Sequence, residues 1–522
     1  MNLTYFLFFI CIIICTMIIT YWAAKRSHTT NHFYTAAGSL TGWQNGLAIA
    51  GDFISAASFL GIVGAIALHG YDGFLYSIGF LVSYLVVMIF IAEPVHHLGR
   101  YSLGDVICAR FASNRMRWTM AIGAFLISIL YMIPQLVAAG LLVRLLLNID
   151  YSVSVVIIGG LMTVYVVFGG MIATSWVQIV KTVVLLSGTF LLSLIVLSRF
   201  DWDVHAIIAK AKDYTPLHEQ FFMTGQLFSN PLELISLQLA LVLGTAGLPH
   251  ILIRFFTVRN TVEVRRSLMS ATWIIGIFYV MTLILGLGTI AFLGYEKLVT
   301  ADATGNLAAP LLAREVGGDF LLAFISAIAF TTIVAVVAGL VISATTSFSH
   351  DIYHHIWKKG TSSEKEQLRA ARWTALGIGL ISTLFALQLE NINVTFLVSL
   401  TFIVAASSNL PVLLLTIYWK RFNQTGAMVG MISGFIVSLA MVILGPNVMD
   451  PVDGWISKDA VFPMYNPGII AIPIGFAGAI LGSIFSGGEE PPQQWEQFYV
   501  YSQTGVTGEG EMIDERNDHH FI

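Results

Sequence analysis

The sequence predicts an all-α integral membrane protein with about thirteen transmembrane helices, and two observations lead to this prediction. Of the 522 residues, 57% are hydrophobic and only 11% are charged, whereas soluble proteins carry roughly 25% charged residues. The apolar residues form continuous runs of about twenty residues, the length that a helix needs to cross a bilayer. Strands of a membrane barrel would instead alternate apolar and polar residues over about ten positions, so we expect helices.

The apolar runs divide the chain into spans that are separated by charged and turn-forming residues. The first run, 3–22, has no basic lead-in and no small-residue cleavage site, so we expect it to stay in the protein as a helix. The following runs are 42–69, 74–93, 118–147, 152–168, 171–198, 232–253, 267–293, 318–349, 372–389, 394–418, 426–445 and 467–486. The segment 487–522 is polar and contains Pro and Gly, which predicts a disordered tail without a folded domain.

The Lys and Arg residues indicate the orientation of the chain in the membrane. Most of them fall in the tail and in the connections that follow odd-numbered spans. Because connections rich in positive residues stay in the cytoplasm, we expect the N-terminus outside and the C-terminus in the cytoplasm. The protein is thus expected to be a multi-pass protein of the cell membrane.

Composition and motifs argue against several classes of function. The net charge of −4 comes with no basic cluster, so we expect no nucleic-acid partner. The sequence has no G-x-x-x-x-G-K-[ST] loop, which an ATP-driven pump would need. No span carries His, Glu and Asp at metal-ligand spacing, and His96, His97, His354 and His355 are expected in loops without partners. We therefore expect no enzyme.

Two spans contain residues that interrupt a helix. The second span carries four glycines around Asp52, and the seventh carries Gly244, Gly247 and Pro249 near its centre. Paired interruptions in distant spans are typical of transporters that bind their substrate at the middle of the membrane. Close packing of neighbouring helices through small residues would give a similar pattern.

Asp52 and Lys181 are the most informative charged residues. Each lies about ten residues into its span, or roughly 15 Å along a helix, near the middle of the bilayer. A charge at that depth costs at least a few kcal/mol unless it is paired or faces water. Both spans enter from the same side, so we expect the two groups to meet as an ion pair, which either fixes helix packing or titrates during function.

Other polar residues within the spans are weaker indicators. Thr331 and Thr332 offer hydroxyl ligands for a cation or a substrate, although such hydroxyls usually bond a preceding carbonyl of their own helix. We expect His250 to be a satisfied core residue. We expect Arg254 to anchor the cytoplasmic end of its helix.

Four segments resemble one known family. They are the stretch NHFYTAAGSLTGWQNGLAIAGDFISAASFLG, the turn VYVVFGGMIATSW, the segment GLPHILIRF, and the region from Thr416 to Gly434, where Ser433 departs from the family's pattern. Together they resemble the sodium/solute symporters over about residues 3–486. The resemblance implies a leucine-transporter-type core at 42–418 with two inverted five-helix repeats. It adds one N-terminal helix at 3–22 and two peripheral helices at 426–486.

Within this family, one group of transporters is most similar. The runs AFTTIVAVVAGLVISATTSFSHDIY and GTAGLPHILIRFF resemble those of bacterial acetate/glycolate permeases. This resemblance implies a small organic anion, an acetate-like monocarboxylate, taken up with Na+ or H+ by alternating access. Another solute, such as an amino acid, a sugar or a vitamin carboxylate, remains an alternative, as does a membrane sensor or channel that retains the fold. No oligomeric state is indicated.

The resemblance also implies a Na+ site, from which this sequence departs. The family's backbone ligands fall on the carbonyls of Gly51, Ile54 and Thr332, whereas its two hydroxyl ligands become Ala335 and Val336. A small cation that is held by oxygen atoms does not readily lose two of its ligands. Na+ is thus the one bound cofactor that the resemblance implies, and two of its ligands are missing unless a shift of one helical turn lets Thr331 and Thr332 replace them.

Lys181 suggests an explanation for the missing ligands. It lies one helical turn beyond the position where relatives carry a Trp-Thr-Asp segment, which here reads Trp176-Val177-Gln178. We hypothesise that Lys181, paired with Asp52, replaces the sodium ion and couples transport to protons. The candidate residues for substrate binding and coupling are Gly51, Asp52, Phe53, Ile54, Ser55, Lys181, Gly244, Thr245, Gly247, Thr331 and Thr332.

Overall fold

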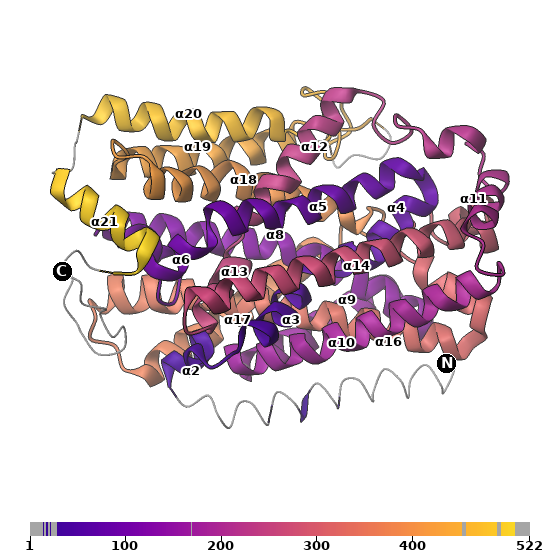
Figure 1. The fold of residues 1–522 in the computed structure, drawn as a ribbon, viewed down its shortest axis with the longest axis horizontal. Coiled ribbons are helices and arrows are strands. Elements are labelled where there is room, and N and C mark those ends of the chain that lie inside the picture. The colour runs from indigo at the N-terminus through magenta and orange to yellow at the C-terminus, as the bar shows by residue number, and fades with distance from the viewer. Residues whose placement is uncertain are drawn as a thin grey trace.

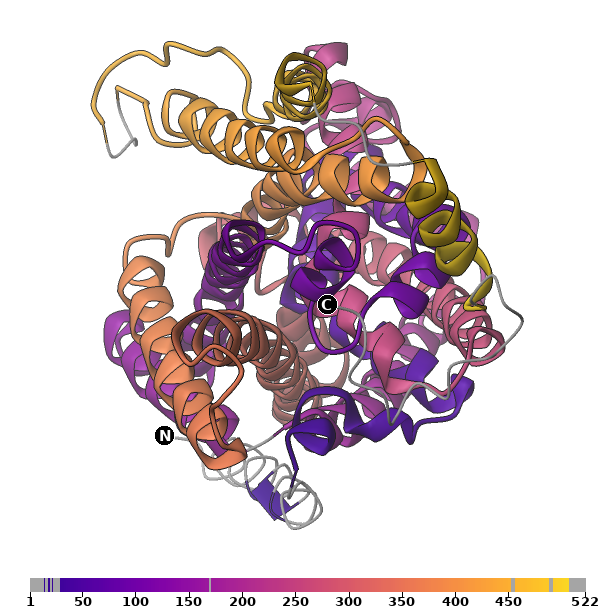
Figure 2. The same ribbon diagram turned by 90° about the vertical axis from the view of Figure 1, so that its left-hand side faces the viewer.

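The computed structural model describes most of the chain as helices. Most of these helices run along the long axis of the molecule (Figure 1) and are seen nearly end on in Figure 2. The expected first span, 3–22, lies mostly outside the described residues. Those residues are 29–168, 170–451, 456–487 and 492–506, together with 14, 17, 18 and 21.

The first broken helix consists of α3 (Gly42–Phe53) and α4 (Ile62–His69). A capping box starts α3, because the Thr41 side chain accepts from the Gln44 backbone while the Gln44 side chain accepts from the Thr41 backbone. Helix α3 ends before Ile54, whose backbone is extended, and a short π-helical turn at Ala57–Gly61 leads into α4. The two parts meet at a bend of 65°.

The second broken helix consists of α12 (Pro231–Gly244) and α13 (Pro249–Leu252). A 3-10 turn at Thr245–Gly247 separates them, and Pro249 occupies the first turn of α13, where a missing N–H costs nothing. The bend here is 47°. Both interruptions that the sequence predicts are therefore confirmed.

Among the other long helices, α16 (Ala308–Thr346) is kinked at Gly318, whose φ of 66° is not helical. By length and apolar composition, eight helices in the described part of the chain are able to cross a membrane, or up to ten if each bent pair forms one span. Helices α9 and α17 are not among the eight. The long helices are α5 (Tyr71–Phe90), α8 (Asn114–Leu147), α9 (Tyr151–Phe168), α10 (Met171–Ser198), α14 (Thr261–Leu293), α16 (Ala308–Thr346), α17 (Glu364–Ala386), α18 (Val394–Tyr418), α19 (Gln424–Ile443) and α20 (Gly468–Ser486).

Helix α3 lies inside the bundle, where it packs against α10, α14 and α16. Helices α19 and α20 pack against each other and against α18, and they form one outer side of the molecule, at the top of Figure 1. This arrangement places the break of α3 among the most buried residues. Helix α16 continues beyond Thr346 as a π-helix, Ser347–Trp357.

Short helices join or flank the spans. They are α2 (Thr30–Thr35), α6 (Ala92–Leu98), α7 (Leu103–Cys108), α11 (Val204–Asp213), α15 (Tyr295–Ala301) and α21 (Pro492–Thr504). Helices α6 and α21 lie at the left end of the molecule in Figure 1, and α11 lies at the right end.

Helix α21 corrects the expectation that the whole tail is disordered. It packs against α6, and Trp495 is buried. The guanidinium of Arg110 lies 4.3 Å from the centre of the Trp495 ring and 5.6 Å from that of Phe498. These aromatic residues sit three positions apart, on one face of a helix, and so the tail gains apolar and cation–π contacts that a composition count does not reveal.

Candidate functional site

The break in α3 leaves backbone carbonyls that the helix does not use. Lys181 of α10 donates from its Nζ to the carbonyl of Gly51 and, at 2.8 Å, to the carbonyl of Ile54. The lysine is only 1% exposed. The ammonium thus occupies the two carbonyls on which the family resemblance places a Na+ ion.

Gly51 makes this close approach of α3 and α10 feasible. A Cβ atom at this position would lie 2.6 Å from the Thr182 Oγ1 atom and 2.8 Å from the Gln178 Oε1 atom. Both distances are shorter than carbon–oxygen packing allows, so a larger residue would push the two helices apart. The glycine therefore helps to bring Lys181 within reach of the break.

Asp52 pairs with Arg254 rather than with Lys181. The Arg254 Nε atom forms an ion pair with Asp52, and its Nη1 atom donates to the Ser175 hydroxyl at 2.6 Å. The Nε2 atom of Gln178 donates to Asp52 and also to the Ala335 carbonyl at 2.7 Å. The expected direct Asp52–Lys181 ion pair is wrong, because Lys181 reaches the backbone beside Asp52 instead.

The expected role of Arg254 as an anchor at a membrane surface is also wrong. Its side chain is 1% exposed, and Asp52 is fully buried. The chain enters α13 after the break at Gly247, and a short 3-10 helix at Ile253–Thr257 follows. Because this segment lies against α3, Arg254 points into the bundle rather than toward a membrane surface.

The charges of this network do not balance. Two cationic side chains lie at the carboxylate of Asp52, because Arg254 forms an ion pair with it and Lys181 binds the carbonyls of Gly51 and Ile54 beside it. In addition, the Nη2 atom of Arg254 has no hydrogen-bond partner among the described residues. With both cations charged, the site has an excess of one positive charge, which favours a bound anion or a neutral lysine.

An aromatic layer with unpaired polar atoms adjoins the network. The ring of Phe53 lies 4.8 Å from that of Tyr84 and 6.3 Å from that of Phe402. The hydroxyls of Ser55 and Tyr84 and the Nε2 atom of Gln135 are buried without a hydrogen-bond partner among the described residues. Such groups are costly unless something pairs with them, so this layer is a candidate for solute binding.

Gln135 connects the layer to the break. Its Oε1 atom accepts from the backbone N–H of Ala56 at 3.1 Å, a donor that the interrupted helix leaves free. One turn earlier on α8, Tyr131 lies 5.1 Å from His250, measured between ring centres. Both ring nitrogens of His250 lack a hydrogen-bond partner among the described residues, so the expectation that this histidine is satisfied is wrong.

The residues of the second break contact other helices. The Thr245 hydroxyl donates to Ser83 of α5 at 2.7 Å, and the Gly247 carbonyl accepts from Asn409 of α18 at 2.8 Å. Gly244 fits against Phe402, because a Cβ would lie 2.7 Å from the Phe402 Cβ. Gly244 therefore reaches the aromatic layer through Phe402, whereas Thr245 and Gly247 contact other residues of α5 and α18.

Helix α16 meets the network one turn beyond the expected threonines. The hydroxyls of Thr331 and Thr332 donate to the carbonyls of Ala327 and Ile328 in their own helix, at 2.9 and 3.0 Å. Helix α16 contacts the network through the Ala335 carbonyl, which accepts from Gln178, and through Gly339, where a Cβ atom would collide with the Asp52 carboxylate. Side-chain hydroxyls of α16 thus do not join Lys181 at the α3 break.

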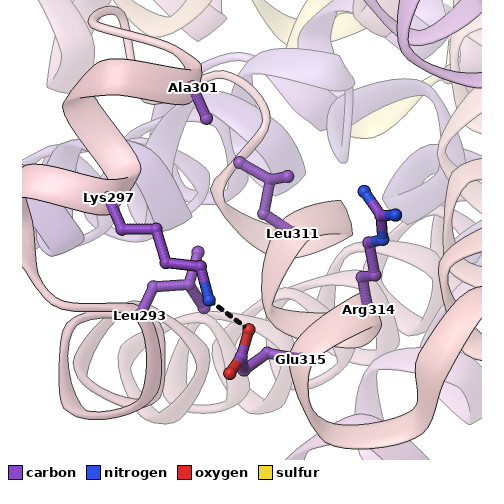
Figure 3. Close-up of a pocket in the computed structure, with 6 residues that line it drawn as sticks. All are labelled: Leu293, Lys297, Ala301, Leu311, Arg314 and Glu315. Carbon is purple, nitrogen blue, oxygen red and sulfur yellow. Dashed lines mark hydrogen bonds and ion pairs between the residues drawn. The ribbon is translucent and has the colours of Figure 1, made fainter.

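The residues at the break of α3 are buried, and a pocket in the described part of the chain lies elsewhere. This pocket has a volume of about 410 Å³ and lies between α15 and the start of α16. Lys297 and Glu315 pair across it at 2.6 Å, and Arg314 lies on its other side (Figure 3). It shares no residue with the network around Asp52, and its charged side chains are exposed, so we assign it no role in transport.

A second buried cluster of charges links α7, α8 and the π-helix that follows α16. Arg117 lies 2.9 Å from Asp105 and 3.0 Å from Asp351, and His350 lies 3.2 Å from Asp105. Burial raises the pKa of the Asp105 carboxyl, but the nearby charges of His350 and Arg117 lower it by more. The pKa of Asp105 therefore lies well below its usual value.

Three histidines that were expected to lack partners are in fact paired. His96 contacts the Phe255 carbonyl at 2.7 Å, His97 contacts the Ser502 carbonyl at 2.9 Å, and His354 contacts the Ser362 hydroxyl at 2.6 Å. These partners lie far away in the sequence or across a tight turn, so spacing did not indicate them.

Comparisons with known proteins agree with the fold and with membrane transport. A model of the sodium:solute symporter family matches residues 33–434. The chain is 54% identical over 513 residues to an uncharacterized symporter, YwcA, of Bacillus subtilis (strain 168), and the match covers 98% of this chain and all of that protein.

Two solved structures have a similar fold. One is a Na+-coupled sialic acid symporter in a substrate-bound outward-open state, with a TM-score of 0.76 and 18% identity over 94% of this chain and 99% of that one. The other is a nucleobase-cation-symport-1 family transporter in a closed conformation with bromovinylhydantoin bound. Its TM-score is 0.53, with 12% identity over 91% of this chain and 99% of that one. These likenesses confirm the leucine-transporter-type fold that the sequence predicts.

Proposed function

The chain belongs to the sodium:solute symporter family, and from this membership we propose that it takes up a small, acetate-like monocarboxylate together with a cation. Uptake would proceed by alternating access about the buried site at the break of α3. We further propose that the protein lies in the cell membrane with its N-terminus outside and its C-terminus in the cytoplasm.

The excess positive charge at the site is the observation that carries the proposal of an anionic substrate. Arg254 pairs with Asp52, Lys181 binds the backbone carbonyls beside this one carboxylate, and one guanidinium nitrogen of Arg254 has no hydrogen-bond partner among the described residues. A carboxylate that entered beside Arg254 would balance the charge and pair with this nitrogen, since guanidinium groups bind carboxylates well. A neutral sugar would supply no such balance.

The dimensions of the surrounding layer favour a small solute. Phe53 packs directly against both Tyr84 and Phe402, which leaves little room beside the network. The unpaired groups of Ser55, Tyr84 and Gln135 are the polar contacts that we assign to the solute. Gly244 would support this layer by positioning Phe402.

Family membership and the Na+-coupled symporter of the same fold support Na+ as the coupling ion, with no organic cofactor. The contacts of Lys181 favour an additional role for a proton. Its ammonium occupies the carbonyls of Gly51 and Ile54. A sodium ion at these carbonyls would lack the two hydroxyl ligands of the family's site, because α16 has Ala335 and Val336 at those positions. We infer that the protonated lysine replaces Na+ at this pair of carbonyls, and that Thr332 contributes no more than a carbonyl.

A competition assay tests the substrate class. Purified protein in liposomes would be given labelled acetate with unlabelled acetate, pyruvate, proline or glucose, each with and without Na+. We expect acetate and pyruvate to compete and proline and glucose to have no effect. Competition by proline or glucose alone would overturn the proposal of a monocarboxylate.

A further inference from the structure

Three metal-binding side chains converge near the end of α16, outside the transport site. They are Asp105 of α7 together with His350 and His355 of the π-helix Ser347–Trp357, and the ligand atoms of all three lie within 4.8 Å of one another. Asp105 and His350 are separated by 245 positions in the sequence. Their convergence is therefore a product of the fold, which sequence spacing does not reveal.

The distance between two of these ligands already suits a metal ion. The Asp105 Oδ1 and His350 Nε2 atoms are 3.2 Å apart. Two ligands bound tetrahedrally at about 2.0–2.1 Å stand roughly 3.3 Å apart. An ion could thus replace the present hydrogen bond with almost no movement of either side chain.

The π-helix brings the third ligand to the same face. Its hydrogen bonds connect residues five positions apart, which is the spacing of His350 and His355, and their ring centres are 4.7 Å apart. His354, the adjacent histidine, contacts the Ser362 hydroxyl and Gln367 instead. The side chain of His355 is partly exposed, so it provides a route for an ion from solvent.

The surrounding charges are compatible with a divalent cation. Asp105 and Asp351 carry two negative charges, whereas Arg117, which bonds both of them, carries one positive charge. One oxygen of Asp351 is buried without a hydrogen-bond partner in the described part of the chain. Histidines that bind a metal ion are neutral, and with neutral histidines the cluster has an excess of one negative charge.

We propose that Asp105, His350 and His355 form a binding site for Zn2+ or a similar divalent transition metal ion, with water as the fourth ligand. Two imidazoles and one carboxylate are a ligand set that zinc accepts. A bound ion would fasten α7 to the end of α16 and would slow the helix movements of transport. This consequence rests on the proposed function, whereas binding itself does not.

Zinc binding to the purified full-length protein in detergent tests the proposal without a transport assay. Metal-free wild type, His355→Gln and His354→Gln would be titrated with Zn2+ against a chromogenic chelator, and thermal unfolding would confirm that the variants fold. His519 and His520 occur in all three proteins, so binding at the proposed site is measured as the difference in Zn2+ binding between the proteins.

Loss of a group that merely orients a metal ligand costs about 10–100-fold in affinity. We therefore expect His355→Gln to lose one equivalent of Zn2+ binding or to bind it at least about tenfold more weakly. His354→Gln should bind as wild type does. Co2+ should give the intense visible absorption of a tetrahedral site with the wild type and the control only. Equal Zn2+ binding by wild type and His355→Gln, or an equal loss in both variants, would overturn the site.

Discussion

Arg254 and Asp52 form a buried ion pair that joins the segment after one broken helix to the end of the other. Asp52 lies in the last turn of α3, and Arg254 follows α13. Lys181 completes the group from α10 by binding the carbonyls on either side of Asp52. The pair thereby couples the positions of both interruptions.

Asp52→Asn tests whether the ion pair holds the two breaks together. The substitution leaves two buried cations without a carboxylate, and removal of one partner of a buried pair costs about 3–5 kcal/mol. We expect a marked drop in the thermal unfolding temperature in detergent and loss of solute uptake. The matched control is Arg265→Gln, which removes the ion pair between this exposed arginine and Glu93 and should leave the unfolding temperature nearly unchanged, because ion pairs at the surface contribute little. Equal stability of the two variants would contradict this assignment.

Gly51→Ala tests the close approach of α3 and α10. The added methyl group would collide with Thr182 and Gln178, and such overpacking costs about 1–3 kcal/mol. We expect lower thermal stability and slower uptake, because Lys181 would be displaced from the break. Gly160→Ala serves as the control, since nothing lies within 4 Å of a Cβ at that position of α9. The idea fails if Gly51→Ala is as active as this control.

Tyr84→Phe tests the layer that we assign to the solute. The Tyr84 hydroxyl has no hydrogen-bond partner in the described part of the chain, so its removal should not lower stability. If the hydroxyl binds the solute, the KM for uptake should rise about five- to tenfold, as expected for a lost hydrogen bond of about 1 kcal/mol or slightly more. Ser382→Ala removes a buried hydroxyl on α17 that also has no hydrogen-bond partner among the described residues, and it should leave KM unchanged. An unchanged KM in Tyr84→Phe would exclude this contact.

The sequence predicted the helical fold and the position of both breaks, because apolar length and Gly or Pro interruptions are local properties. It also placed Asp52 and Lys181 at the same depth, since depth follows from a count of residues along a helix. It did not identify the partner of Asp52. The direction that the chain takes after Pro249 depends on packing against α3, and this packing turns Arg254 inward.

Two other features of the structure could not be predicted from the spacing of residues in the sequence. The approach of Asp105 to His350 depends on the packing of α7 against the π-helix. The pairing of His350 with His355 was also unexpected, because an α-helix places residues three or four apart on one face, whereas these two are five apart. The helix α21 depends on Arg110, nearly four hundred positions earlier, which packs on Trp495. A candidate signal for Arg254 was its place in the segment GLPHILIRF, directly after the second break.

The contact between Lys181 and the broken helix is the centre of this account, and ion-driven uptake tests it most directly. Wild type and Lys181→Gln would be reconstituted in liposomes, and uptake of labelled acetate would be measured with an inward proton gradient alone, an inward Na+ gradient alone, and both. We predict that the proton gradient drives uptake by the wild type, and that Lys181→Gln loses this component. Full dependence on Na+ alone, together with unimpaired uptake by Lys181→Gln, would contradict the account.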